Sequence, residues 1–209
     1  MNMVSQLLRG MRNGRNGAAP PEAPFRLEEN FYAEARKFRE QMEKQLLSAI
    51  DMNDGLTPFT FAYAADSYQF LTASGERVFS RELLDDVINR LRSWAMETLG
   101  ASCVSTPQVR IYLNGCRRDL LLDSTEARYH WMLSLGPPSR ENPARIRLLT
   151  QSIAAEVTGD SMSIDRMTSL QLLFNQLLVH ESSSAYGIEP CKGSINPLEA
   201  TVFLDGYLW

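Results

Sequence analysis

Hydrophobic side chains recur at helical spacing in two stretches of the N-terminal half. Between residues 27 and 50 they lie three or four positions apart, with charged residues between them: Phe31, Ala35, Phe38, Met42 and Leu46. This spacing places the apolar groups on one face of a helix. A second helix is predicted over residues 81–99, with Ser80 as its N-cap and Gly100 in the left-handed position that ends it. We therefore expect two long N-terminal helices, each with one buried face.

Between the two helices the pattern changes to that of extended chain. Residues 58–63 alternate aromatic with small side chains, which is typical of a half-buried strand. Residues 68–71 and 77–79 flank the turn-like sequence 72–76, and this arrangement predicts a hairpin or an edge loop.

From Pro107 onward the chain is predicted to be mostly β. Residues 159–163 are turn-like, and residues 136–143 form a loop by composition. Two helices followed by several short strands indicate an α+β fold, an antiparallel barrel or sandwich with the two long helices packed outside. The predicted strands are residues 109–113, 130–135, 145–157, 176–180 and 200–209.

Composition and charge narrow the function classes. The formal net charge of −4 provides no basic field, so we expect no nucleic-acid partner. No apolar run is long enough to span a bilayer, so we expect no membrane insertion. The cysteines Cys103, Cys116 and Cys191 are widely spaced and odd in number, which favours reduced thiols and a cytoplasmic location.

The first 25 residues differ in composition from the rest of the chain. They are rich in Gly, Asn and Pro, and this composition predicts a flexible N-terminal arm with no packed core. A short amphipathic helix over residues 4–11 that docks on a partner is the alternative. Residues 26–209 are long enough for one domain with a substantial core.

Two C-terminal stretches carry a resemblance to a known enzyme family. The first is the strand at residues 109–113, which contains Tyr112 and is followed by Gly115. The second consists of a strand and a small-residue turn at residues 175–190 and a closing strand with a Gly-aromatic pair at residues 204–208. The order of these elements resembles the Fe(II)/2-oxoglutarate-dependent dioxygenases, especially their prolyl-hydroxylase-like branch. The resemblance covers about the second half of the chain, residues 107–209, and implies a double-stranded β-helix of the jelly-roll or cupin type.

The resemblance also identifies where the family's chemical groups would stand. The family's His-x-Asp motif falls on Leu121 and Asp123, its distal histidine falls on Tyr186, and its 2-oxoglutarate-binding arginine falls on Thr201. Leucine has no lone pair, and neutral tyrosine is a poor Fe(II) ligand. Threonine cannot form the bidentate pair that arginine makes with a carboxylate. The sequence thus predicts a degenerate member without the usual iron ligands, whose pocket is lined by Tyr112, Leu121, Asp123, Tyr186 and Thr201.

A rearranged metal site is an alternative. The chain has only two histidines, His130 and His180, and strand pairing could bring both to Asp123. Such a site would hold Fe(II) with 2-oxoglutarate as cosubstrate. Each histidine alone is more commonly a hydrogen-bonded core residue, and the Arg117–Arg118 pair is more commonly a solvated surface pair than an anion site.

These observations support three hypotheses about function. The leading one is a non-catalytic, dioxygenase-like protein without a cofactor, which acts as a partner or binding subunit, with an active paralogue or a second copy as its protein partner. The second is an active Fe(II)/2-oxoglutarate hydroxylase of a small metabolite or peptide. The third is a barrel that binds a small molecule in an apolar pocket around Tyr112, Leu121 and Tyr186.

Overall fold

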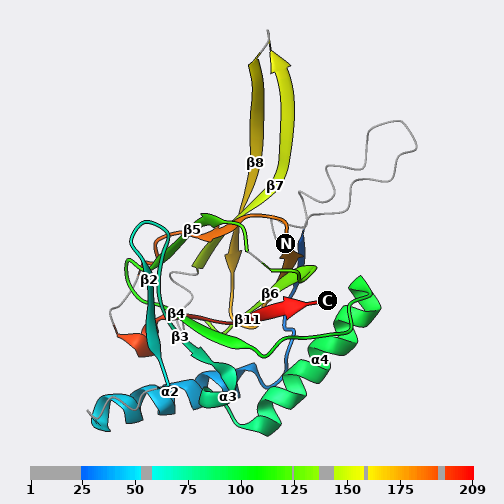
Figure 1. Ribbon diagram of the computed structural model, residues 1–209. Helices are drawn as coiled ribbons and strands as arrows, with labels where there is room; N and C mark the ends of the chain where they lie inside the picture. Colours follow the sequence, from blue (N-terminus) through cyan, green and yellow to red (C-terminus); the bar gives the residue numbers. More distant parts are fainter. Residues whose placement is uncertain (1–24, 53–57, 124, 137–143, 158–159, 193–195) are drawn as a thin grey trace, which may run out of the picture.

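The computed structural model describes residues 25–52, 58–123, 125–136, 144–157, 160–192 and 196–209. The predicted arm lies almost wholly outside these ranges. Two helices pack beneath a curved antiparallel sheet, and a long hairpin projects from the opposite side (Figure 1). The elements are β1 (Phe25–Glu28), α2 (Ala35–Met52), β2 (Thr60–Ala64), β3 (Tyr68–Ser74), α3 (Gly75–Val78), α4 (Arg81–Leu99), β4 (Gln108–Tyr112), β5 (Arg117–Leu121), β6 (Tyr129–Ser134), β7 (Ala144–Val157), β8 (Asp160–Leu172), β9 (Leu177–Glu181), β10 (Tyr186–Ile188), η1 (Pro197–Glu199) and β11 (Thr201–Leu208).

The strands follow the order β1-β9-β6-β11-β4-β3-β5-β10-β7-β8, with β2 paired to β3. Strand β3 joins the two halves of this sheet, because it pairs with β4 along most of its length and with β5 at Tyr68 and Gln69. All of these pairings are antiparallel. The sheet is a half-barrel of the jelly-roll type, as the sequence predicted.

Alternation along the central strands builds two separate cores. On β4, β6, β9 and β11 one set of alternating residues faces the helices, and its members include Val109, Trp131, Val179 and Val202. The other set faces the barrel interior, and its members include Tyr112, Met132, Leu178 and Phe203. A strand whose two faces are both buried must supply apolar groups to both sides, which accounts for the near-continuous hydrophobic runs of β6 and β9.

The helical part differs in one respect from the pair that the sequence predicted. Among the described residues there are three α-helices, α2, α4 and the one-turn α3. Helix α4 lies where it was expected, and Gly100 ends it in the left-handed conformation at φ 68°. Helix α2 begins at Ala35, whereas residues 27–34 had been predicted to be helical. Leu27 and Glu28 belong to β1 and pair with β9, and residues 29–34 form a bend and a turn in which the backbone N–H groups of Phe31 and Tyr32 donate to Asn175 instead of to a helical carbonyl.

The hairpin predicted around residues 72–76 is wrong. These residues end β3 and begin α3, and the backbone N–H of Gly75 donates to the carbonyl of Pro107. The hairpin instead joins β2 to β3, with Ser67 N–H donating to the carbonyl of Ala64 in its turn. The misplaced prediction arose because Ser74-Gly75, a turn-like dipeptide by composition, is used here at a strand-to-helix junction.

The turn predicted at residues 159–163 is wrong for residues 160–163, and residue 159 lies outside the described residues. Strand β8 begins at Asp160 and pairs with β7 from Val157–Asp160 down to Ala144–Leu172. The polar sequence of β8 carries no clear alternation, so its partner β7 determines its conformation. Beyond Leu149, the hairpin formed by β7 and β8 extends away from the body of the molecule (Figure 1).

Within the part of the chain that the structure describes, no helix combines the length and the apolar character needed to cross a membrane.

Candidate functional site

The positions singled out by the resemblance converge inside the barrel. Leu121 on β5 and Tyr186 on β10 are direct cross-strand partners, and Tyr112 on β4 is the partner of Thr201 on β11. Tyr112 and Tyr186 are almost completely buried, with 1% and 0% exposed surface. These positions are therefore cross-strand neighbours in two pairs, and the two tyrosines fill the space beside them.

A bulge in β5 turns an arginine into this interior. Tyr186 and Ile188 on β10 are two residues apart, whereas their partners Leu121 and Arg118 on β5 are three apart. The extra residue allows Leu121 and Arg118 to lie on the same face as Tyr186. Arg118 is therefore buried, which corrects the prediction that Arg117 and Arg118 form a solvated pair; only Arg117 is half-exposed.

Arg118 binds the aspartate that follows Leu121. One guanidinium nitrogen, Nη2, donates to Oδ1 of Asp123 at 2.5 Å, and the guanidinium carbon lies 4.3 Å from the ring centroid of Tyr186. The side chains of Arg118 and Asp123 are 11% and 9% exposed. A charged pair this well shielded is held by both the ion pair and the aromatic face.

These residues do not fit an iron ion. Leu121 has no atom that could bind a metal. The phenol of Tyr186 stays protonated because burial raises its pKa. The negative charge of Asp123 is already balanced by the ion pair with Arg118. Among the described residues no three His, Cys, Asp or Glu side chains gather as a group that could hold a metal. Asp123, His130 and His180, the three residues of the rearranged site, do not form such a group among the described residues.

A second buried ion pair lies deeper in the barrel. Nε of Arg110 lies 2.9 Å from Oδ2 of Asp205, and Nη1 of Arg110 donates to the phenol oxygen of Tyr186 at 2.9 Å. Burial is the largest single effect on the pKa of Arg110 and lowers it, but the attraction of Asp205 together with that of Tyr186, Tyr112 and Tyr207 outweighs burial and raises the pKa well above its ordinary value. The charge on Arg110 is therefore permanent.

The two histidines continue this network in a line. His130 and His180 are cross-strand partners on β6 and β9, and Nδ1 of His130 lies 3.2 Å from Nε2 of His180. The other nitrogen of His130, Nε2, lies 3.4 Å from Oδ2 of Asp205. Asp205 and His180 thus contact opposite edges of one ring. A facial metal triad needs its ligands to point at a common centre, and this chain of contacts does not.

The hydrogen-bond partners indicate which ring nitrogens of His130 and His180 carry a proton. Burial, and then the proximity of His130, lower the pKa of His180 to about 3, so its ring is neutral. Nδ1 of His180 donates to the carbonyl of Glu181 at 2.9 Å, which leaves Nε2 to accept from Nδ1 of His130. The rings of Tyr186 and His130 stack with centroids 4.8 Å apart. The barrel interior is thus a connected polar core.

Sequence reasoning missed Arg110 and Asp205. Both stand at inward positions of strands that otherwise carry hydrophobic side chains, two residues before Tyr112 and two after Phe203. A charged residue at a strand position that the alternating pattern predicts to be buried is uncommon, and that signal could have identified Arg110 and Asp205. Their pairing could not be read from the sequence, since it depends on which strands are neighbours.

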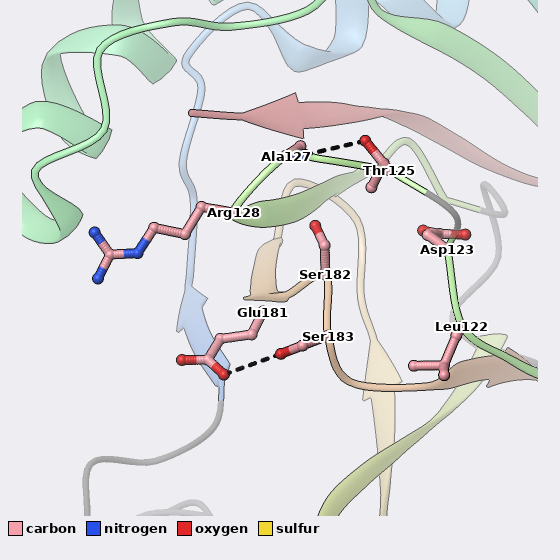
Figure 2. Close-up of a pocket in the computed structure, with 8 residues that line it drawn as sticks. All are labelled: Leu122, Asp123, Thr125, Ala127, Arg128, Glu181, Ser182 and Ser183. Carbon is pink, nitrogen blue, oxygen red and sulfur yellow. Dashed lines mark hydrogen bonds between the residues drawn. The ribbon is translucent and has the colours of Figure 1, made fainter.

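The mouth of the barrel is a hollow between the loop after β5 and the turn after β9. Figure 2 shows the carboxylate of Asp123 and the hydroxyl of Ser182 on either side of this hollow, with Arg128 pointing away from it. Its lining residues are Leu122, Asp123, Thr125, Ala127, Arg128, Glu181, Ser182 and Ser183.

Comparisons with known proteins identify the fold. No protein-family model matches the sequence, and no curated protein matches it. Solved structures do match: a prolyl-4-hydroxylase from Pseudomonas putida has a TM-score of 0.59 at 12% identity, covering 90% of this chain and 92% of that one. A prolyl hydroxylase from Trichoplax adhaerens, in complex with a hypoxia-inducible-factor peptide fragment, has a TM-score of 0.60 at 13% identity, covering 90% and 84%.

A third similar structure is a non-heme α-ketoglutarate-dependent epimerase from nogalamycin biosynthesis. Its TM-score is 0.58 at 7% identity, covering 88% of this chain and 76% of that one. The chain therefore has the fold of the Fe(II)/2-oxoglutarate oxygenases over nearly its whole length, which extends the resemblance of the C-terminal half to the helical part as well.

Proposed function

We propose that this protein is a non-catalytic member of the oxygenase fold, which works as a binding subunit for another protein and holds no iron. One observation carries the proposal. The carboxylate in the family's aspartate position, Asp123, is bound by an internal cation, Arg118, which stacks on Tyr186 in the distal-histidine position. A guanidinium supplies the positive charge that a metal would supply, and it does so without open coordination positions for a cosubstrate or oxygen.

The cosubstrate position supports the same proposal. Thr201, in the place of the arginine that binds 2-oxoglutarate, is buried and stands beside the thiol of Cys191. Arg110, an arginine of the barrel interior, is paired with Asp205 and Tyr186. A dicarboxylate would have to break these pairs in order to bind, and breaking a buried pair costs about 3–5 kcal/mol.

An exposed aromatic edge strand supports a protein partner. Strand β2 pairs only with β3 among the described strands, so one of its edges is unpaired. Phe61 and Tyr63 on β2 are 56% and 57% exposed and stack on one another with centroids 6.2 Å apart. Large exposed aromatic residues on a free edge are a common feature of protein-binding surfaces. We propose an active oxygenase of the same fold as the partner.

Anaerobic titration with Fe(II) and 2-oxoglutarate tests the proposal. A chelated complex of the two gives a charge-transfer absorbance, and we expect no saturable band with this protein. An active prolyl hydroxylase titrated alongside verifies the conditions, and a cooperative thermal transition verifies that the sample is folded.

A saturable band that disappears in Asp123→Ala would overturn the proposal, because it would place a working metal site at the aspartate that Arg118 now binds. It would instead favour the active hydroxylase with a rearranged site.

A further inference from the structure

A glycine bulge places two cysteines opposite each other, at the turn between β4 and β5. Gly115 has a φ of 80° in this turn, where the N–H of Cys116 donates to the carbonyl of Leu113 at 2.9 Å. The N–H of Gly115 donates to the carbonyl of Cys191, and the N–H of Cys191 donates to the carbonyl of Cys116, both at 2.9 Å. In such a β-bulge two residues of one strand, the first a glycine of positive φ, face one residue of the other. Cys191 is that one residue, and Cys116 lies across from it.

The two side chains enter the same core. Cys116 and Cys191 are 6% and 9% exposed, and both belong to the apolar cluster of the barrel interior that includes Tyr112 and Phe203. Burial raises the pKa of the Cys191 thiol to about 12, with smaller effects from the hydroxyl of Thr201, which lowers it, and from Cys116, which raises it. A charge affects the pKa of another group in this way only where the two lie close together.

The backbone geometry meets the requirement of a disulfide. Residues joined by hydrogen bonds across an antiparallel pair have Cα atoms about 5.5 Å apart. Disulfides usually join Cα atoms about 4.4–6.8 Å apart. The structure holds Cys116 and Cys191 as free thiols. Rotation of the two side chains is therefore enough to bring the sulfur atoms together, and the backbone can stay where it is.

The cover over this pair is thin. Gly115, directly before Cys116, is exposed, and so are Pro190 and Lys192 on either side of Cys191. Both sulfur atoms thus lie just beneath the surface, within reach of a molecule as small as hydrogen peroxide.

We propose that Cys116 and Cys191 are a site of reversible oxidation, at which a peroxide converts the two thiols into a disulfide. With hydrogen peroxide, one thiolate attacks an oxygen atom, becomes a sulfenic acid and releases hydroxide. The second thiolate attacks the sulfenic sulfur, forms the S–S bond and releases a second hydroxide. The two protons lost by the thiols convert these hydroxides to water. The sulfur atoms lose two electrons, the peroxide gains them, and a dithiol reverses the modification by thiol–disulfide exchange.

The bond closes the part of the chain from residue 116 to residue 191, which contains β5 to β10. A disulfide that closes a long loop stabilises the fold by restricting the unfolded chain, so we expect oxidation to raise the midpoint of thermal unfolding by roughly 5–10 °C. The inference does not depend on the proposed function, because it involves neither the positions assigned to iron nor a protein partner.

Peptide mapping of the oxidised full chain tests the proposal. Trypsin releases the three cysteines in separate peptides: Cys103 in residues 93–110, Cys116 in residues 111–117 and Cys191 in residues 167–192. The folded protein is treated with hydrogen peroxide, the remaining thiols are alkylated with iodoacetamide, and the digest is analysed by mass spectrometry without reduction. We expect peptides 111–117 and 167–192 to be joined, and to separate after treatment with dithiothreitol.

Thermal unfolding provides a second measurement. Cys103→Ser is the parent protein, because it removes the exposed thiol and with it disulfides between molecules. Its midpoint should rise on oxidation and fall back on reduction. Cys116→Ser and Cys191→Ser in this parent are matched controls and should show no rise. Each variant is compared with its own reduced form, so a variant of lower stability still gives a result.

Two results would overturn the inference. One is a peroxide treatment that oxidises Cys103 but leaves Cys116 and Cys191 either alkylated or oxidised to sulfinic acid without a bond between them. The other is a bond that forms in urea and not in the folded protein, because the fold then does not hold the two sulfur atoms within reach of each other.

Discussion

Gly187 lies where β10 crosses the bulge of β5, between Tyr186 and Ile188. A Cβ atom built at this position would stand 2.9 Å from the carbonyl oxygen of Arg118 and 3.0 Å from backbone atoms of Asp119 and Leu120. Backbone atoms cannot move aside as a flexible side chain can. The glycine is therefore what allows β10 to lie close enough for Arg118 to reach Tyr186.

For Gly187→Ala we expect a loss of about 1–3 kcal/mol in the free energy of unfolding, because the methyl group separates the two strands. Urea unfolding followed by circular dichroism measures it. The control is Gly100→Ala, which has a positive φ but no atom within 4 Å of the added Cβ, so it should cost about 1 kcal/mol or less from conformational strain alone. Equal losses in the two variants would contradict the close approach of β10 and β5.

At the scale of elements, β6 and β9 are joined through the buried pair His130 and His180 as well as through their backbones. His180 has a pKa of about 3 in the folded protein and an ordinary value of 6.5. Below pH 6.5 the unfolded chain takes up a proton on this ring, and the folded chain does not. Stability from this histidine is therefore complete above pH 6.5 and is lost as the pH falls from 6.5 towards 3.

This shift in the pKa of His180 predicts that the free energy of unfolding depends measurably on pH. The free energy of unfolding should fall by up to about 1.4 kcal/mol per pH unit between pH 6 and pH 4 because of His180. In His180→Gln this contribution disappears, so the variant should show a shallower dependence even where it is less stable overall. Urea unfolding of both proteins across this range measures the slopes. Identical slopes would mean that His180 is protonated in the folded protein.

At the scale of the whole molecule, the fold brings together positions on different strands that the family resemblance assigns to metal ligands. Leu121 and Tyr186 are cross-strand partners, and Asp123 lies two residues beyond Leu121. The double variant Leu121→His with Tyr186→His should bind Co(II) weakly, since Arg118 still binds Asp123 and repels a cation. Adding Arg118→Ala should produce saturable binding, visible in the d–d absorption of Co(II).

The outcome tests the role assigned to Arg118. Adding Asp123→Ala to the triple variant is the control and should abolish the absorption. Equal Co(II) affinity of the double and triple variants would show that Arg118 does not keep the metal away. No binding by a folded triple variant would show that the three positions do not converge.

The sequence by itself determined the class of fold and most of the elements. Helix α4, its glycine end and the strands β4, β6 and β11 follow from periodicity, because a buried face imposes a fixed spacing of apolar residues on one segment. The convergence of Tyr112 with Thr201 and of Leu121 with Tyr186 followed from the family resemblance, since equivalent positions on a shared fold are neighbours in space. The identities at those positions are the basis for predicting a member of this fold without the usual iron ligands.

Only the tertiary structure decided what stands in their place. The pairs Arg118–Asp123 and Arg110–Asp205, and the line from Asp205 through His130 to His180, join residues of different strands. Strand β8 and strand β1 likewise owe their conformation to their partners. Periodicity records which face of one segment is buried, but a charge in a buried position is stable only beside its counterion. Which segments become neighbours is set by the pairing of strands far apart along the chain.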